Sequence, residues 1–150
     1  MKKKIWYNNY YKRNTREICH EIKNRNEECY KIMADFFLEQ EIIDNQSILI
    51  PAPQHEGYAI YTKEIAEMIA SKSGAKVVDI IKSNPRKTLY EYKRNHQKIT
   101  LDFKLTEKLC IDSQKVFFVD NVLHTGQTFQ LCEKIIGYPL IPLIYGVSRV

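Results

Sequence analysis

The chain has 150 residues, of which 44% are hydrophobic, and this is enough for one globular domain with a real core. It has no apolar run long enough to cross a bilayer and no signal-peptide pattern at its start, so we expect a cytoplasmic protein without membrane contact. Its formal charge of +5 is concentrated in two basic blocks, residues 1–16 and 82–98, which favours specific anion sites over a uniform nucleic-acid-binding surface. The four cysteines form no Cys-x-x-Cys pair, which disfavours a zinc ribbon and a disulfide framework.

Residues 1–45 are predicted to form an N-terminal arm followed by helices. Basic and aromatic residues mix in the arm, as in a nucleic-acid contact or in an arm packed on the domain or on a partner subunit. We favour the packed arm, because no nucleic-acid module follows, and a homodimer is one assembly it would serve. Asn14 with Glu17 resembles a capping box at the start of a first helix, and a second helix is expected over 27–43. These helices would cover a sheet or form a small hood.

Residues 46–150 are predicted to form an α/β core within the same single domain. Apolar runs that predict strands alternate here with amphipathic stretches that predict helices. The predicted strands are 47–51, 76–81, 116–119 and 140–147, and the predicted helices are 58–72 and 127–136. This alternation predicts a mostly parallel sheet of about five strands, flanked by helices and joined by right-handed crossovers.

The segment from Val116 to Thr128 gives the strongest functional signal in the chain. Its four apolar residues predict a strand buried on both faces, and Asp120 follows where that strand would leave the core. A glycine between two threonines then opens the last helix, whose N-terminal N–H groups and dipole favour an anion. The carboxylate of Asp120 can accept hydrogen bonds from sugar hydroxyls. Together these features indicate a site for a phosphorylated, hydroxylated ligand.

The same segment resembles the phosphoribosyl-diphosphate (PRPP) motif of type I phosphoribosyltransferases, in which four apolar residues, two acidic residues and three variable positions precede Thr-Gly-x-Thr. The resemblance implies that Asp120 and Asn121 are catalytic, although Asn121 stands where an acid is usual. His124 stands where purine-type members have an acidic residue near the base. It is a candidate proton carrier, a phosphate contact or a helix-start residue without chemistry. The residues implied to grip the 5′-phosphate are Thr125, Gly126, Gln127 and Thr128.

Two further loops follow predicted strands, and the resemblance assigns both to the diphosphate. The loop after residue 51 is similar to the pyrophosphate loop of competence-associated (ComF-type) members. Its candidate contacts are Pro53, Gln54 and His55, of which His55 is either a phosphate ligand or an ordinary turn residue. The segment 82–111 lacks clean periodicity, and a connection of this length is usually functional or mobile. It is either a solvated hairpin or a flexible basic loop that closes over the ligand. The cations of that loop would be Arg86, Lys87, Lys93 and Arg94.

The implied reaction is displacement of pyrophosphate from C1 of PRPP by a nitrogen nucleophile, either a nucleobase or an amine. Mg²⁺ is the implied cofactor. It would bridge the diphosphate and the ribose hydroxyls without a direct protein ligand, and Asp120 would reach it through water. The acceptor has no readable signature. A non-catalytic, PRPP-sensing regulator of the same fold is the alternative, because a neutral Asn121 stabilises a cationic transition state less than an acid would.

Overall fold

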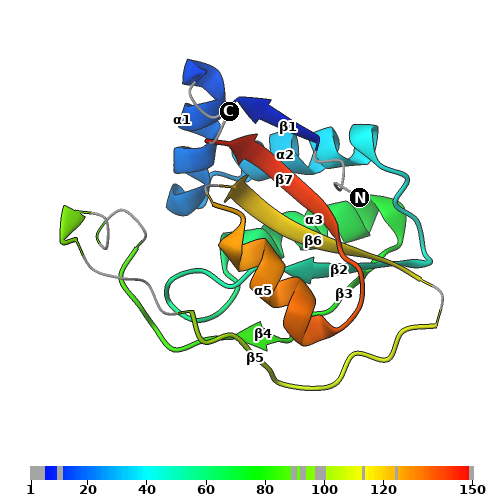
Figure 1. Ribbon diagram of the computed structural model, residues 1–150. Coiled ribbons are helices and arrows are strands. Elements are labelled where there is room, and N and C mark those ends of the chain that lie inside the picture. Colours follow the sequence, from blue (N-terminus) through cyan, green and yellow to red (C-terminus); the bar gives the residue numbers. More distant parts are fainter. Residues whose placement is uncertain are drawn as a thin grey trace.

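The computed structural model describes residues 6–9, 12–88, 91, 94–96, 101–112, 114–123 and 125–148. Within these residues, one five-stranded sheet has the order β1-β7-β6-β2-β3, and every neighbouring pair is parallel (Figure 1). The strands are β1 (Trp6–Asn9), β2 (Ser47–Pro51), β3 (Lys76–Val77), β6 (Lys115–Leu123) and β7 (Ile141–Val147). This architecture confirms the predicted α/β class with a mostly parallel sheet flanked by helices.

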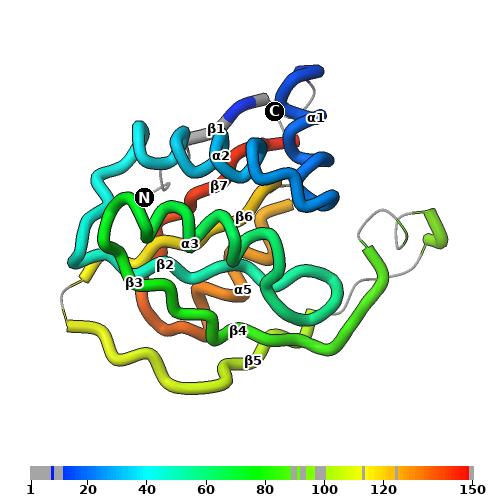
Figure 2. The backbone as a smooth tube through the Cα atoms, turned by 180° about the vertical axis from the view of Figure 1, so that it is seen from behind, coloured from blue at the N-terminus to red at the C-terminus, as the bar shows by residue number. Residues whose placement is uncertain are grey.

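Helices cover both faces of the sheet. The helices are α1 (Arg13–Glu21), the 3₁₀ turn η1 (Ile22–Asn24), α2 (Glu27–Gln40), α3 (Tyr61–Ser73) and α5 (Gln127–Ile136). The first three α-helices and η1 lie on one face, as Figure 2 shows from behind, and α5 lies on the other face. None of the helices in the described part of the chain is both long and apolar enough to cross a membrane.

The core lies on both sides of the central strands β2 and β6. All five residues of β2 are buried, and so are Val116 to Val119 of β6. Side chains alternate along a strand, so Phe117 packs in the α1–α3 layer while Phe118 packs in the α5 layer. Burying one such ring stabilises the fold by about 1.5–3 kcal/mol. Burial on both faces is what the unbroken apolar run predicted.

Local signals set several helix boundaries. The side chain of Asn26 accepts a hydrogen bond from the N–H of Cys29 and caps the start of α2. Gly74, with φ of +79°, ends α3 at the predicted stop. The helix predicted over 127–136 is observed with those bounds. The predicted capping box is wrong, because α1 begins at Arg13 and its N-cap, Lys12, makes no side-chain capping bond.

One strand that was not predicted and two that were predicted with other bounds depend on pairing with distant segments. The arm contributes β1, an unpredicted edge strand whose Trp6 and Asn8 pair with Leu143 and Gly146 of β7. The predicted strand 76–81 divides. Its first two residues form β3, and β4 (Ile81–Lys82) leaves the sheet to pair in antiparallel fashion with β5 (Lys104–Leu105). The strand predicted to end at residue 119 continues to Leu123, so Asp120 lies within β6.

The second helix ends at Gln40 instead of residue 43.

Candidate functional site

The carboxyl ends of β2 and β6 meet at one edge of the sheet. Ile50 and Pro51 of β2 pair with Phe118 and Val119 of β6, and the N–H of Ala52 donates a hydrogen bond of 2.9 Å to the carbonyl of Val119. The loop that follows β2 therefore starts beside Asp120. Parallel α/β sheets bind ligands at this edge.

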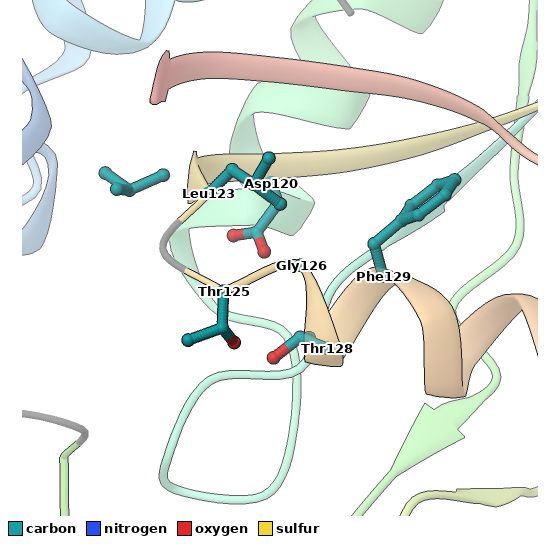
Figure 3. Close-up of a pocket in the computed structure, with 7 residues that line it drawn as sticks. Asp120, Leu123, Thr125, Gly126, Thr128 and Phe129 are labelled. Carbon is teal, nitrogen blue, oxygen red and sulfur yellow. The ribbon is translucent and has the colours of Figure 1, made fainter. Parts of the chain in front are cut away.

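Asp120 occupies a half-buried position on the α5 face of the sheet. Its Oδ1 accepts a hydrogen bond of 2.8 Å from the N–H of Asn121. Figure 3 shows its carboxylate directed toward the turn that leads into α5. Burial raises the pKa of Asp120 to about 7, against the lowering effects of the Asn121 N–H and of the charge on Arg86. Near neutral pH this group is therefore both a hydrogen-bond acceptor and a proton donor.

The predicted phosphate cradle lies directly beneath Asp120. Gly126 adopts the left-handed conformation, with φ of +81°, and the Thr125 hydroxyl accepts a hydrogen bond of 3.3 Å from the N–H of Gln127. The first turn of α5 holds no acidic residue that would repel an anion, and the helix dipole favours one there. Asp120 and Thr128 share a hollow of about 30 Å³ here. The hollow is also lined by Val122, Leu123, Thr125, Gly126 and Phe129.

The size of this hollow limits what it can hold. About 30 Å³ is room for a water molecule and little more, so a phosphate would sit at the mouth, above the start of α5. Thr125 and Gln127 are exposed, whereas Thr128 is half-buried. The predicted phosphate-binding turn, residues 125–128, is thus accessible from the solvent.

Asn121 is directed away from Asp120. It follows Phe117 and Val119 in the alternation of β6, which places its side chain on the α1–α3 face, and it is only 8% exposed. Its carbonyl accepts a weak hydrogen bond from the thiol of Cys19 on α1, at 3.9 Å. Burial, and next the charge of Asp120, raise the pKa of that thiol to about 12. His124 lies outside the described residues.

Gln54 forms the internal framework of the loop after β2. Its Nε2 donates to the Ala52 carbonyl at 2.8 Å and to the Thr62 hydroxyl at 3.2 Å, and its Oε1 accepts from the N–H of Ile60. The residue is 4% exposed, and Pro53 is buried as well. Among the three predicted contacts, only His55 reaches the surface, where its Nε2 lies 3.3 Å from the Glu56 carboxylate.

Arg86 connects the basic segment to this loop. Its N–H donates to the carbonyl of His55 at 2.8 Å, and the N–H of Ser83 donates to the carbonyl of Gly57 at 2.9 Å. Its guanidinium lies over the ring of Phe103, with Cζ 5.7 Å from the centroid. Nε and Nη1 are buried and have no hydrogen-bond partner among the described residues. Of the other predicted loop cations, Lys87 and Arg94 are exposed, and Lys93 lies outside the described residues.

Three residues of the site were not singled out from the sequence. Gly57 has φ of +102°, and a Cβ there would lie 2.3 Å from the carbonyl oxygen of Ser83. Its position between two predicted elements was the signal that could have found it. Tyr61 begins α3, and burial, followed by the charge of Asp120, raises the pKa of its hydroxyl. Phe103 supports Arg86, and no local pattern marks it.

No protein-family model matches the chain, and no curated protein matches it in sequence. Among solved structures it is similar to a purine phosphoribosyltransferase from Pyrococcus horikoshii Ot3, at 13% sequence identity and a TM-score of 0.38. The match covers 95% of this chain and 86% of that one. A likeness this loose does not determine the function or the reacting residues.

Proposed function

We propose that the protein binds PRPP at the carboxyl edge of the sheet and transfers its phosphoribosyl group to a nitrogen nucleophile, with release of pyrophosphate. The observation that best supports the proposal is the placement of Arg86. Arg86 has two buried nitrogens without a hydrogen-bond partner in the described part of the chain. It is fixed beside the loop after β2, close enough to lower the pKa of Asp120. Buried donors without partners are costly, and an anionic ligand would satisfy them.

Each part of the edge suits a different part of PRPP. The start of α5, with Thr125, Gly126, Gln127 and Thr128, would hold the 5′-phosphate. Asp120 would accept hydrogen bonds from the ribose hydroxyls, and its negative charge would favour the positive charge that develops at C1. Arg86 would bind the diphosphate and stabilise the charge gained as the bond to C1 breaks.

In the proposed function, Mg²⁺ is a companion of the ligand. No cluster of three or more His, Cys, Asp and Glu residues that could hold a metal ion occurs in the described part of the chain. Asp120 is the carboxylate that would contact a magnesium-bound water. When bound, Mg²⁺ would neutralise part of the charge on the diphosphate.

A non-catalytic PRPP sensor is the second candidate, and the position of Asn121 favours it. A second acid at this place in the motif would be expected to help stabilise the transition state. Here the side chain is neutral, buried and on the opposite face of the sheet from Asp120. With this arrangement Asp120 and the start of α5 could still bind PRPP, but position 121 would supply no acid to the transfer reaction.

Three further expectations are part of the proposal. The Pro-x-Pro start of the loop after β2 favours a similarity to the competence-associated, ComF-type phosphoribosyltransferases. A cytoplasmic location suits a PRPP-dependent reaction, and a homodimer is the assembly we would test first. The acceptor would be a nucleobase or an amine.

A pyrophosphate-release screen distinguishes the two candidates. The wild-type protein would be incubated with PRPP, Mg²⁺ and a panel of purine, pyrimidine and amine acceptors, with Asp120→Asn as the matched inactive control. Release that depends on one acceptor and on Asp120 supports the transferase. Saturable PRPP binding without release from any acceptor supports the sensor, and the absence of both overturns the proposal.

A further inference from the structure

The segment 82–111 runs out from β4 (the outgoing limb) and comes back through β5 (the returning limb), and the two limbs are paired where they start and end. Ile81 and Lys82 of β4 pair with Leu105 and Lys104 of β5 in antiparallel fashion. The N–H of Thr106 donates to the carbonyl of Ile80 at 2.8 Å, which extends this stem by one bond. The two limbs are therefore held together at 80–82 and 104–106, a few residues from Arg86 along the chain.

Asp102 continues this connection toward Arg86. Its two carboxylate oxygens lie 3.3 and 3.4 Å from the N–H of Asn84, which donates to them from the outgoing limb. The next residue, Phe103, is 9% exposed and packs in the α5-side core with Phe118 and Ile50. Its ring is thus fixed by the core, while the backbone of Arg86 is fixed by the loop after β2.

Two contacts limit where the guanidinium of Arg86 can lie. The ring of Phe103 lies within the range of a cation–π interaction with it. The backbone hydrogen bond from the N–H of Arg86 to the carbonyl of His55 fixes where the side chain begins. A guanidinium ordered in advance loses less freedom when an anion arrives, and this raises affinity without a new contact.

We infer that Phe103 is a positioning residue that holds the guanidinium of Arg86 in place for an anionic ligand, and that Asp102 secures the limb that delivers it. This inference rests on the proposed function for the identity of the anion, which is the diphosphate of PRPP. Phe103 itself acts through Arg86 and does not touch the ligand.

The test uses pyrophosphate as the probe, in the full chain. Phe103→Leu keeps an apolar side chain and removes the π face, Phe103→Tyr keeps the π face, and Phe36→Leu makes the same change in the α1–α3 layer. Two quantities are measured: the NMR shift of the Arg86 Nε proton, which a ring beneath it moves upfield, and the Kd for pyrophosphate by calorimetry. Thermal unfolding confirms that each variant is folded.

Phe103→Leu is expected to lose the upfield shift and to raise the Kd about 2- to 30-fold, while Phe103→Tyr and Phe36→Leu change neither. Asp102→Ala, which leaves the ring intact, is expected to raise the Kd by a smaller factor. An unchanged shift and Kd in folded Phe103→Leu would overturn the inference alone. If the wild-type protein binds neither pyrophosphate nor PRPP, the proposed function fails, and the proton shift still decides whether Phe103 positions Arg86.

Discussion

An Asp120→Asn variant is expected to be more stable than the wild-type protein above pH 7 and to bind PRPP weakly. The change removes the charge and keeps the shape. The amide oxygen of asparagine can still accept the 2.8 Å hydrogen bond from the N–H of Asn121. Any effect on stability therefore reports mainly on the cost of holding a charged carboxylate in this half-buried position.

The direction of the effect follows from the raised pKa of Asp120. The folded protein holds the proton up to a pH of about 7, whereas an ordinary Asp releases it near 3.8. This contribution to stability is full below pH 3.8 and is lost as the pH rises through 7. A shift of roughly three pKa units corresponds to about 4 kcal/mol as an upper limit, of which about 3 kcal/mol falls between pH 5 and pH 8. Asparagine does not titrate and avoids this loss.

Urea unfolding of both proteins at pH 5, 6, 7 and 8 measures the effect. Taking the difference between variant and wild type cancels the titration of other groups. Asp35→Asn is the matched control, because hydrogen bonds from Lys72 and Lys31 lower the pKa of Asp35, and it stays ionised across this range. A stability advantage of Asp120→Asn that does not grow with pH, or that grows equally in Asp35→Asn, would refute the reasoning. Loss of the charge should weaken PRPP binding about 10- to 100-fold.

Three other predictions concern the loop, the cradle and the metal. Gly57→Ala should lose about 2–4 kcal/mol in urea unfolding, because its Cβ would meet the Ser83 carbonyl at positive φ. Gly137→Ala, also at positive φ but with open space around it, should lose only about 1 kcal/mol, and equal losses would count against the clash. Thr128→Val should raise the Kd for PRPP about 5- to 10-fold in calorimetry while leaving the unfolding midpoint near that of wild type, and an unchanged Kd would remove this hydroxyl from the cradle. Mg²⁺ alone should not raise the melting temperature, whereas Mg²⁺ with PRPP should raise it and EDTA should reverse that rise. Stabilisation by Mg²⁺ alone would indicate a direct metal site.

The parts of the fold that the sequence predicted are those encoded by local patterns. The buried run in β6 and the amphipathic stretch of α5 each carry their own signal, and the start of α5 after Gly126 follows from a short motif. β1 was missed because its four residues become a strand only by pairing with β7, more than 130 residues away. The division of 76–81 was missed because both halves carry β-branched apolar residues and are distinguished by the distant strands they pair with.

The same distinction applies to the site. Asp120 was proposed as a site residue because it directly follows an obvious apolar run, and that run is the buried part of β6. The structural role of Gln54 was not predicted, since its hydrogen bonds to Thr62 and Ile60 depend on how the loop folds back onto α3. The pairing of Arg86 with Phe103 joins two sides of a long segment without periodicity, and sequence spacing does not encode it.

The central claim is that Arg86 and its neighbours form a PRPP-binding edge. Calorimetric titration of Mg²⁺–PRPP into the wild-type protein, Arg86→Met and Arg13→Met tests it most directly. Arg13 is the charge-matched control, because it lies exposed on α1 and its guanidinium pairs with Glu17 on the same helix. We predict saturable binding by the wild-type protein and Arg13→Met, and a Kd at least about 10-fold higher for Arg86→Met. No binding by the wild-type protein, or equal binding by both variants, would contradict the account.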